Sequence, residues 1–251
     1  DGMIGRFAGT DVAACGFSTT SRASVEAHVA GEGAAARTHA VVTDPTGRVV
    51  GWASVHDRAA GRVIVGLSVD PEVGEREADA VGAALYTWAE REGCRLARER
   101  SLSRTQLDAG AFAGDARKHR WLAAAGYDHV RTWWQMARTV VPAEGEPGAF
   151  PDPQQGVVVR QVVGDDGEPS QGDLRAVHDV LETAFTDHFN YHEESFDEFV
   201  ERQQQEVGHA WDHWWLVEVE DAEPVGALIG ERSAGGAGPD GTYVAYLGVT
   251  Q

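Results

Sequence analysis

The sequence predicts an α/β protein made of two similar tandem domains, each built on a mixed sheet, and three observations predict this class. First, the segment HAVVTDPTGRVVGWASVHDRAAGRVIVGLSVDPE is repeated in outline by WWLVEVEDAEPVGALIGERSAGGAGPDGTYVAYLGVTQ near the end of the chain. Second, strand-like and helix-like patterns alternate in both copies. Third, a stretch rich in proline and glycine, 141–156, separates the copies and is typical of a linker. A repeat at so long a period indicates tandem domains, because solenoid repeats recur every ~20–50 residues.

The two copies match most closely where their strands begin and end. In each copy an apolar strand runs into an acidic turn, and the next strand opens with Val-Gly, at Gly51 and again at Gly226. The third strand ends in Leu, a small residue and Val, at 67–69 and again at 247–249. The expected organisation is a first domain over 1–140, a linker over 141–156 and a second domain over 157–251.

In the first copy, hydrophobic periods and turn residues define the elements. Asp44 to Gly47 reads as a turn, and apolar positions at i, i+3, i+4 and i+7 predict a long helix that ends at Gly93. The predicted elements are a helix over 24–30 capped by Ser24, strands over 39–43, 49–56 and 62–69, a helix over 75–93, a strand over 94–102, a helix over 115–126 and a strand over 128–138. This copy lacks the opening strand of the second copy.

The second copy supplies the opening elements. Ser195, followed three residues later by Glu198, forms a capping box that starts a helix. The predicted elements are a strand over 157–162, helices over 174–185 and 195–207, and then the three repeated strands. Because the third repeated strand ends at Gln251, we expect the second domain to break off after its fourth strand and to leave an open edge. Overlaying the copies gives the order β-α-α-β-β-β-α-β-α-β.

Composition and charge exclude several classes of function. The formal net charge of −19 argues against nucleic acid, whose phosphates need a basic surface, and against anionic membranes. Cys15 and Cys94 are too few and too far apart for a disulfide framework or a zinc site. No apolar run approaches the ~18 residues needed to span a bilayer, and no signal peptide opens the chain. We expect a cytoplasmic protein whose oligomeric state stays open.

The order and spacing of these elements resemble the GNAT acetyltransferase superfamily, in its two-domain actinobacterial form with a silent first and an active second half, as in mycothiol synthase. The second copy carries the resemblance in VGALIG, TYVAYLGVT and AFTDHFNYHEESFDEF. The first copy carries it in RVVGWAS, LSVDPE, GAALYTWAEREG and WLAAAGYDHVRTWWQMAR. The resemblance implies two GNAT-like domains, the first without its N-terminal strand and the second ending after its fourth strand.

The resemblance also implies acetyl-CoA as cosubstrate, with its pantetheine arm paired to the backbone of the fourth strand. That role falls on Leu247, Gly248 and Val249, and on Leu67, Ser68 and Val69 in the first copy; packing in a buried core strand is the alternative reading. A Gln/Arg-x-x-Gly-x-Gly/Ala loop then cradles the pyrophosphate at a helix N-terminus. Aligned on 77–82, the first copy keeps Gly82 but carries Glu77 and Asp79, which would repel the ligand, so we expect this copy to be degenerate.

The catalytic residues cannot be assigned from the sequence. In the first copy Leu122 stands where the family often has a general-acid tyrosine, and Tyr127 stands in a position that is more often core. In the second copy the turn between two helices would line the acceptor cleft, with Asp187, His188 and Tyr191 as acceptor-binding residues. A capped turn with solvated polar side chains is the alternative.

The predicted activity is acetyl transfer from acetyl-CoA to a primary amine of a small molecule or peptide, with no metal and with no turnover expected from the chain as it stands. One alternative is a non-catalytic CoA-binding or scaffolding module. A more remote one is a metal-dependent hydrolase, since His188 and His192, like His209 and His213, are spaced i, i+4. The paired tryptophans Trp133-Trp134 and Trp214-Trp215 are expected to place one ring of each pair in a core.

Overall fold

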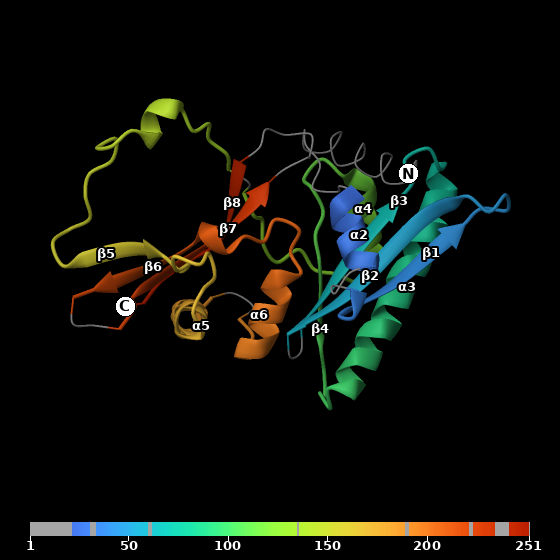
Figure 1. The fold of residues 1–251 in the computed structure, drawn as a ribbon. Helices are drawn as coiled ribbons and strands as arrows, with labels where there is room; N and C mark the ends of the chain where they lie inside the picture. The colour runs from blue at the N-terminus through green and yellow to red at the C-terminus, as the bar shows by residue number, and fades with distance from the viewer. Residues whose placement is uncertain are drawn as a thin grey trace.

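The fold contains two four-stranded sheets that lie beside each other in a mixed α/β arrangement (Figure 1). The computed structural model describes residues 22–30, 34–59, 62–134, 136–188, 191–220, 223–233 and 241–250 of the chain. We call residues 22–127 the N-terminal half and residues 157–250 the C-terminal half. Each half has a hydrophobic core of its own.

The first sheet has the order β1-β2-β3-β4, in which β4 is parallel to β3 and the other pairs are antiparallel. Its strands are β1 (Arg37–Thr43), β2 (Val49–Ala59), β3 (Arg62–Val69) and β4 (Gln106–Ala109), and its helices are α2 (Arg22–Ala30), α3 (Glu75–Glu99) and α4 (Ala116–Ala124). Alternate residues of β3, from Val63 to Val69, are buried and pack with Leu85 and Tyr86 of α3. The period-2 pattern of the strand and the 3.6-residue period of the helix therefore meet in one core.

The second sheet has the order β5-β6-β7-β8 and is antiparallel throughout. Its elements are β5 (Val157–Gln161), α5 (Gln171–Phe185), α6 (Phe196–Gln204), β6 (Trp214–Val219), β7 (Gly226–Ser233) and β8 (Gly241–Val249), with short 3₁₀ turns η2 (Pro142–Gly145) and η3 (Trp211–His213). The apolar faces of α5 and α6 cover one side of the sheet around Trp214, Leu216 and Ile229. Ser195 and Glu198 form the predicted capping box at the start of α6.

The repeat seen in the sequence is also a repeat of strand register. Gly51 of β2 faces Val69 of β3, and Gly226 of β7 faces Val249 of β8. The two glycines allow close packing against different neighbours. A Cβ on Gly51 would lie 2.5 Å from a methyl of Val81 in α3, and a Cβ on Gly226 would lie 3.1 Å from Val217. The second and third repeated strands therefore start from the same register in both halves and share it over the first four pairs, from Gly51 to Ser54 and from Gly226 to Ile229.

Three predicted boundaries in the N-terminal half are wrong. Gly93 does not end α3, and residues 94–102 are not a strand: the helix continues to Glu99 because Leu96 and Ala97 extend its buried face. Gly93 is instead buried where β4 crosses the helix, and a Cβ there would lie 3.2 Å from Leu107. The N-terminal helix begins at Arg22, so Ser24 lies inside it and does not cap it.

The strand predicted over 128–138 is also absent from the residues that the structure describes there. Trp133 and Trp134 are 67% and 84% exposed, and Met136 is exposed as well. None of the described residues of this segment pairs with a strand, and β4, the last strand of the first sheet, is only four residues long. The prediction of one core ring per tryptophan pair is therefore wrong here. It is confirmed for the other pair, in which Trp214 is buried and Trp215 is half-buried.

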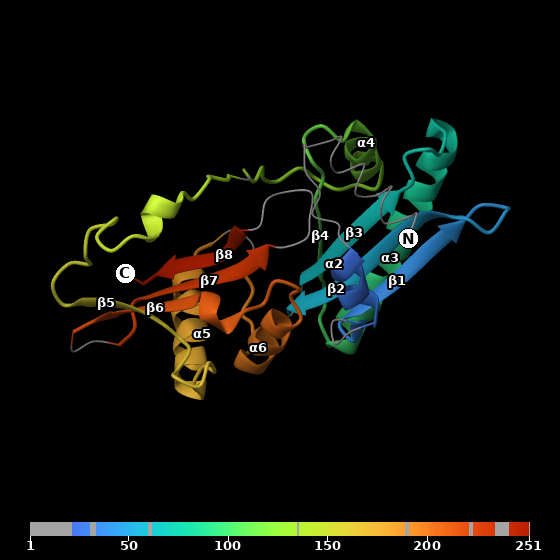
Figure 2. The ribbon, with the colours of Figure 1, turned by 45° about the horizontal axis from the view of Figure 1, so that its top comes forward.

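The end of the β2–β3 hairpin points towards α6 of the C-terminal half, as both views of the ribbon show (Figures 1 and 2). Arg100, just after α3, joins the halves by donating to Asp57 of β2 at 2.7 Å and to Glu198 of α6 at 3.1 Å. The chain between the halves, over 141–156, is largely exposed and holds only the η2 turn. Residues far apart in the sequence therefore meet at this hairpin end.

Candidate functional site

A β-bulge interrupts β8 next to the segment that the sequence marks for the cofactor. Ile229 of β7 faces Tyr246, but the next residue, Gly230, faces Val244, so Ala245 has no partner in β7. A bulge bends its strand, leaves one residue out of the ladder and is over-represented beside active sites. The equivalent stretch of β2 and β3 pairs one to one from Gly51 to Asp57 and has no bulge.

The predicted cofactor segment follows the bulge on an open edge, as expected, since β8 is the last strand of its sheet among the described residues. Gly248 is buried beneath α5, where a Cβ would lie 3.0 Å from atoms of both Ala184 and Leu181. Leu247 and Val249 point to the other face and are 62% and 64% exposed. The backbone of this segment is thus held close to a helix on one face and open along its edge.

The predicted acceptor residues lie at the end of α5. Asp187 and His188 are exposed, and the ring of His188 stacks at 5.8 Å on Trp133, which lies in the segment after the N-terminal half. Tyr191 donates a 2.6 Å hydrogen bond to Glu182 Oε2, and this bond raises the pKa of Tyr191 to about 12. The structure therefore keeps these side chains near one helix end. Residues 189 and 190 lie outside the described part of the chain.

Behind this turn is a polar cluster that the sequence reasoning missed. Arg202 of α6 donates to both carboxylate oxygens of Glu194, at 2.8 and 2.7 Å, and the two side chains are only 10% and 9% exposed. Arg202 also donates to Tyr246 Oη at 3.3 Å, and Arg58 from β2 donates to the same oxygen. One sequence signal existed: Arg202 shares the apolar face of α6 with Phe199, a position where a charged residue needs a buried partner.

A carboxylate that can accept a proton lies in the same region. Glu231 of β7 is half-buried. It is the residue after Gly230, where the strand register shifts, and it pairs with Tyr243 of β8. Burial and the neighbouring charge of Glu206 raise its pKa, while Arg202 opposes the shift. A carboxyl with a raised pKa is better matched to taking a proton from an ammonium group near neutral pH. The sequence analysis did not single out Glu231, because its neighbours here come from α6 and the following loop.

In the N-terminal half, β3 and β4 part at the predicted cofactor segment. The parallel pairing covers Arg62 to Val65 of β3 and stops at Ala109 of β4. Leu67, Ser68 and Val69 continue beyond it without a partner strand on that side in the described residues. Leu67 and Val69 are nevertheless buried against α3, and Ser68 is half-buried.

The predicted pyrophosphate loop over 77–82 is wrong, because these residues are helical. The loop after β3 spans only 70–74, and α3 begins at Glu75. Gly82 lies in the second turn, where a Cβ would lie 2.8 Å from the Trp121 ring of α4. The structure therefore assigns Gly82 to close helix packing, and it leaves the set of cofactor residues.

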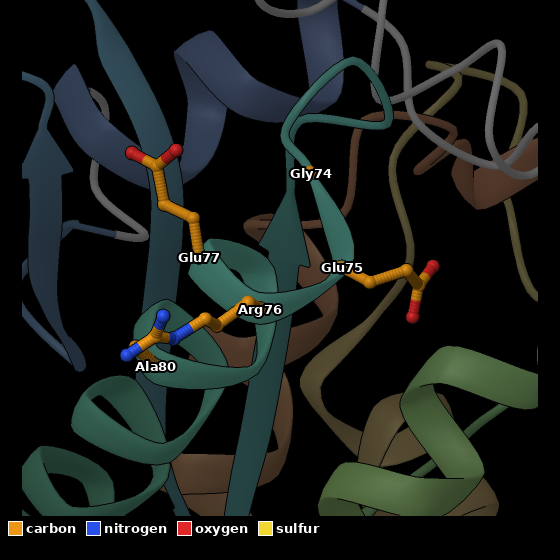
Figure 3. A pocket seen from close by; sticks show the side chains of 5 residues that line it. All are labelled: Gly74, Glu75, Arg76, Glu77 and Ala80. Carbon is orange, nitrogen blue, oxygen red and sulfur yellow. The ribbon is translucent and has the colours of Figure 1, made fainter.

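An open hollow of about 510 Å³ lies at the N-terminus of α3 and is lined by Gly74, Glu75, Arg76, Glu77 and Ala80 (Figure 3). Glu75 and Glu77 project from the first turn on opposite sides of the helix, and acidic groups at this end stabilise the helix itself. Arg120 of α4 already pairs with Glu75 at 2.6 Å. The hollow therefore presents two carboxylates beside the single guanidinium of Arg76, and this net negative charge disfavours a pyrophosphate.

In this half, an aliphatic side chain stands at the predicted position of the proton donor, and two tyrosine hydroxyls belong to the core. Leu122 packs against the core and has no proton to give. The hydroxyls of Tyr86 and Tyr127 are buried without a hydrogen-bond partner among the described residues, and their rings lie 5.4 Å apart. Burial raises the pKa of Tyr127 to about 12, in keeping with its predicted place in the core.

Among the residues that the structure describes, no three His, Cys, Asp or Glu side chains gather closely enough to hold a metal ion. His209 instead packs its ring edge-on against Trp211 at 4.1 Å. Within the same described ranges, no helix is both long and apolar enough to cross a bilayer.

No protein-family model and no curated protein matches this chain. Its structure is similar to that of a GCN5-related N-acetyltransferase from Sphaerobacter thermophilus, with a TM-score of 0.57, 21% sequence identity, and coverage of 84% of this chain and 61% of that one. A probable acetyltransferase has a TM-score of 0.37 at 11% identity, covering 55% of this chain and 90% of that one. An acetyltransferase from Trypanosoma brucei has a TM-score of 0.29 at 22% identity, covering 43% and 72%.

The TM-scores of 0.37 and 0.29 are too low to show a shared fold. The first similarity shows that the chain has the mixed α/β fold of a GCN5-related N-acetyltransferase. The chain spans 61% of the length of that relative.

Proposed function

We propose that this chain belongs to an acetyl-CoA-dependent N-acetyltransferase whose active site lies in the C-terminal half and which acetylates a primary amine. The single observation that carries the proposal is the bulge at Ala245, which precedes an open strand edge in β8 and has no counterpart in β3. A thioester laid along that edge would meet unpaired backbone groups at the bend. The acetyltransferase fold of the Sphaerobacter thermophilus relative supports the reaction class.

In this proposal the backbone of Leu247, Gly248 and Val249 binds the pantetheine arm as an added strand would. Gly248 sets the depth of the groove, since a side chain there would strike α5. The amine nitrogen attacks the thioester carbonyl, the C–N bond forms, the C–S bond breaks, and the thiolate leaves with a proton taken from the amine. Glu231 is the proposed base that takes the first proton from the ammonium form of the acceptor before this attack, because burial raises its pKa beside the bulge.

The acceptor molecule would lie between this edge and the end of α5, against Asp187, His188 and Tyr191. Tyr191 is held in place by its bond to Glu182, and His188 by its stacking on Trp133. A primary amine of a small molecule or peptide fits a rim that mixes an exposed carboxylate with aromatic rings. The proposed domain limits are 1–140 and 157–251, joined by the linker over 141–156.

The N-terminal half is proposed to be non-catalytic. Its strands part at Leu67, Ser68 and Val69, so it keeps the geometry for a cofactor arm. The carboxylates of Glu75 and Glu77 in the first turn of α3 disfavour a phosphate there, and the apolar Leu122 offers no proton. This combination favours a second candidate role for this half alone, as a scaffold that contacts the C-terminal half.

Hydrogen exchange with and without acetyl-CoA tests which strand receives the cofactor. We expect slower exchange in peptides that cover 241–250 and little change in peptides that cover 62–69. Calorimetry with acetyl-CoA on the same sample measures the affinity. Protection confined to 62–69 would reverse the assignment of the two halves, and the absence of binding would reject the proposed function.

A further inference from the structure

The hairpin of the N-terminal half places a guanidinium beside β8, the strand that carries the proposed cofactor edge of the C-terminal half. Arg58, near the end of β2, donates to Tyr246 Oη, although the two residues are 188 positions apart in the sequence. Tyr246 is the residue after the bulge in β8, and Arg202 donates to the same oxygen. Two cations from different halves thus meet beside the strand edge where the acetyl group would lie.

The other arginines of this region are already neutralised by carboxylates. Arg62 pairs with Asp108 at 2.7 Å, and Arg100 pairs with Asp57 at 2.7 Å. Arg202 pairs with Glu194. Arg58 differs from these three, because a phenol oxygen is its hydrogen-bond partner and no carboxylate of the described residues forms an ion pair with it.

Arg58 is also partly removed from water and surrounded by like charge. Burial lowers its pKa, and the charges of Arg202 and Arg62 act in the same direction, while Tyr246 and the charge of Glu194 oppose the shift. The same positive charges act on the neighbouring His56. Burial and the charges of Arg37, Arg58 and Arg202 lower the pKa of His56 to about 3. A half-buried guanidinium without an anion is costly, and a carboxylate or phosphate that forks onto it relieves that cost.

We propose that Arg58 binds an anionic oxygen group of the acceptor, so that the substrate carries a carboxylate or phosphate near the amine that is acetylated. The inference rests on the proposed function and names a substrate class for it. Glu231 and Glu206 interact with Arg202, and these carboxylates suit the ammonium end of such a molecule. The two halves would then bind one acceptor that carries both an amine and an anionic group. The N-terminal half would supply specificity through the contact of Arg58 with the anionic group.

Isothermal titration with N-acetylglycine and N-acetylglycinamide tests the proposal, because the two probes differ only in the carboxylate. Wild-type protein should bind the acid and discriminate against the amide. Arg58→Gln should weaken the binding of the acid at least about tenfold, the usual scale for a hydrogen bond to a charged group, while Arg58→Lys keeps part of it. Arg48→Gln, at the other end of β2, is the matched control and should change the affinity less than about twofold.

Tyr246→Phe separates an anion site from a structural clamp. It removes the phenol oxygen but leaves the guanidinium, so acid binding should persist within about threefold if Arg58 recognises the anion. An equal loss in Tyr246→Phe and Arg58→Gln, with equal falls in melting temperature, would identify a clamp and overturn the proposal. Equal binding of acid and amide by the wild type would overturn it as well. O-phosphoethanolamine, compared with ethanolamine, distinguishes phosphate from carboxylate as the preferred group.

Titration with acetyl-CoA keeps the two proposals apart. Arg58→Gln should leave the acetyl-CoA affinity unchanged, and a tenfold fall would make Arg58 a cofactor contact and reject its role toward the acceptor. If the wild type binds no acetyl-CoA but still prefers the acid to the amide, the anion site stands and the proposed function fails. If acetyl-CoA binds and the preference is missing, the proposed function stands and this inference fails.

Discussion

The buried ion pair between Arg202 and Glu194 yields a quantitative prediction for the proposed acceptor site. Two bonds of 2.8 and 2.7 Å join the groups, and water reaches about a tenth of either side chain. Two unit charges at this separation attract by about 6 kcal/mol for an effective dielectric constant of ~20. Glu194→Gln keeps the shape but leaves Arg202 buried without its counter-ion, so we expect the free energy of unfolding to fall by about 3 kcal/mol.

Urea unfolding, followed by tryptophan fluorescence and circular dichroism, measures this change. Fluorescence is suited to it because Trp214 lies 5.9 Å from Phe199, and the guanidinium of Arg202 lies 5.7 Å from the same Phe199 ring. Loss of the pair should therefore lower the urea midpoint seen by fluorescence without changing the slope of the transition.

A matched control removes a carboxylate from a more exposed pair. Asp173→Asn takes one partner from Arg160, which keeps Glu218 at 2.8 Å, so the loss should stay below about 1 kcal/mol. Replacing both buried charges, as Glu194→Leu with Arg202→Met, should recover most of the stability, because neither charge is then left alone. The reasoning is refuted if Glu194→Gln costs no more than the exposed control.

Three further predictions concern packing, pH and charge. Gly82→Ala should lower the free energy of unfolding by about 1–2 kcal/mol, since its Cβ would lie 2.8 Å from the tryptophan ring of α4. Gly172→Ala, whose Cβ would have no contact nearer than 3.6 Å, should raise that free energy by about 0.5–1 kcal/mol. Urea unfolding that shows the same sign for both variants would contradict this prediction. Burial and nearby arginines lower the pKa of His56 to about 3 from 6.5, so its neutral ring stabilises the fold above pH 6.5 and that contribution is lost as pH falls towards 3; His56→Asn should flatten the fall in melting temperature between about pH 7 and 5, and an unchanged slope would count against it. Glu75→Gln combined with Glu77→Gln should raise the acetyl-CoA affinity of the N-terminal half about tenfold by calorimetry, because two anions leave the helix N-terminus, and equal heats in variant and wild type would reject that electrostatic account.

Elements whose signals lie within a few residues of one another were predictable from the sequence. The turn at Asp44 and the capping box at Ser195 specify their own hydrogen bonds, and the structure has both. The acidic turn of α3 was recognised too, although its alignment was wrong. The alignment took Gly82 as a phosphate-binding glycine, but Gly82 lacks a side chain because the ring of Trp121 packs closely against it.

Elements that depend on a distant partner were mispredicted. Gly93 reads locally as a helix end, yet Leu107 from β4 occupies the space that it leaves, and the helix runs on. The alternating pattern around Trp133 and Trp134 reads locally as a strand, yet no described strand lies beside it to complete a ladder. Local propensity cannot report whether such a partner exists.

The sequence by itself predicted a repeat of three strands, because similar side-chain patterns bury the same face and favour the same pairing. Only the tertiary structure decided where the copies differ. The bulge at Ala245 is a mismatch in residue count between two strands, which neither strand encodes alone. The meeting of Arg58, Arg202 and Tyr246 joins three separate elements across both halves, so no single element encodes it.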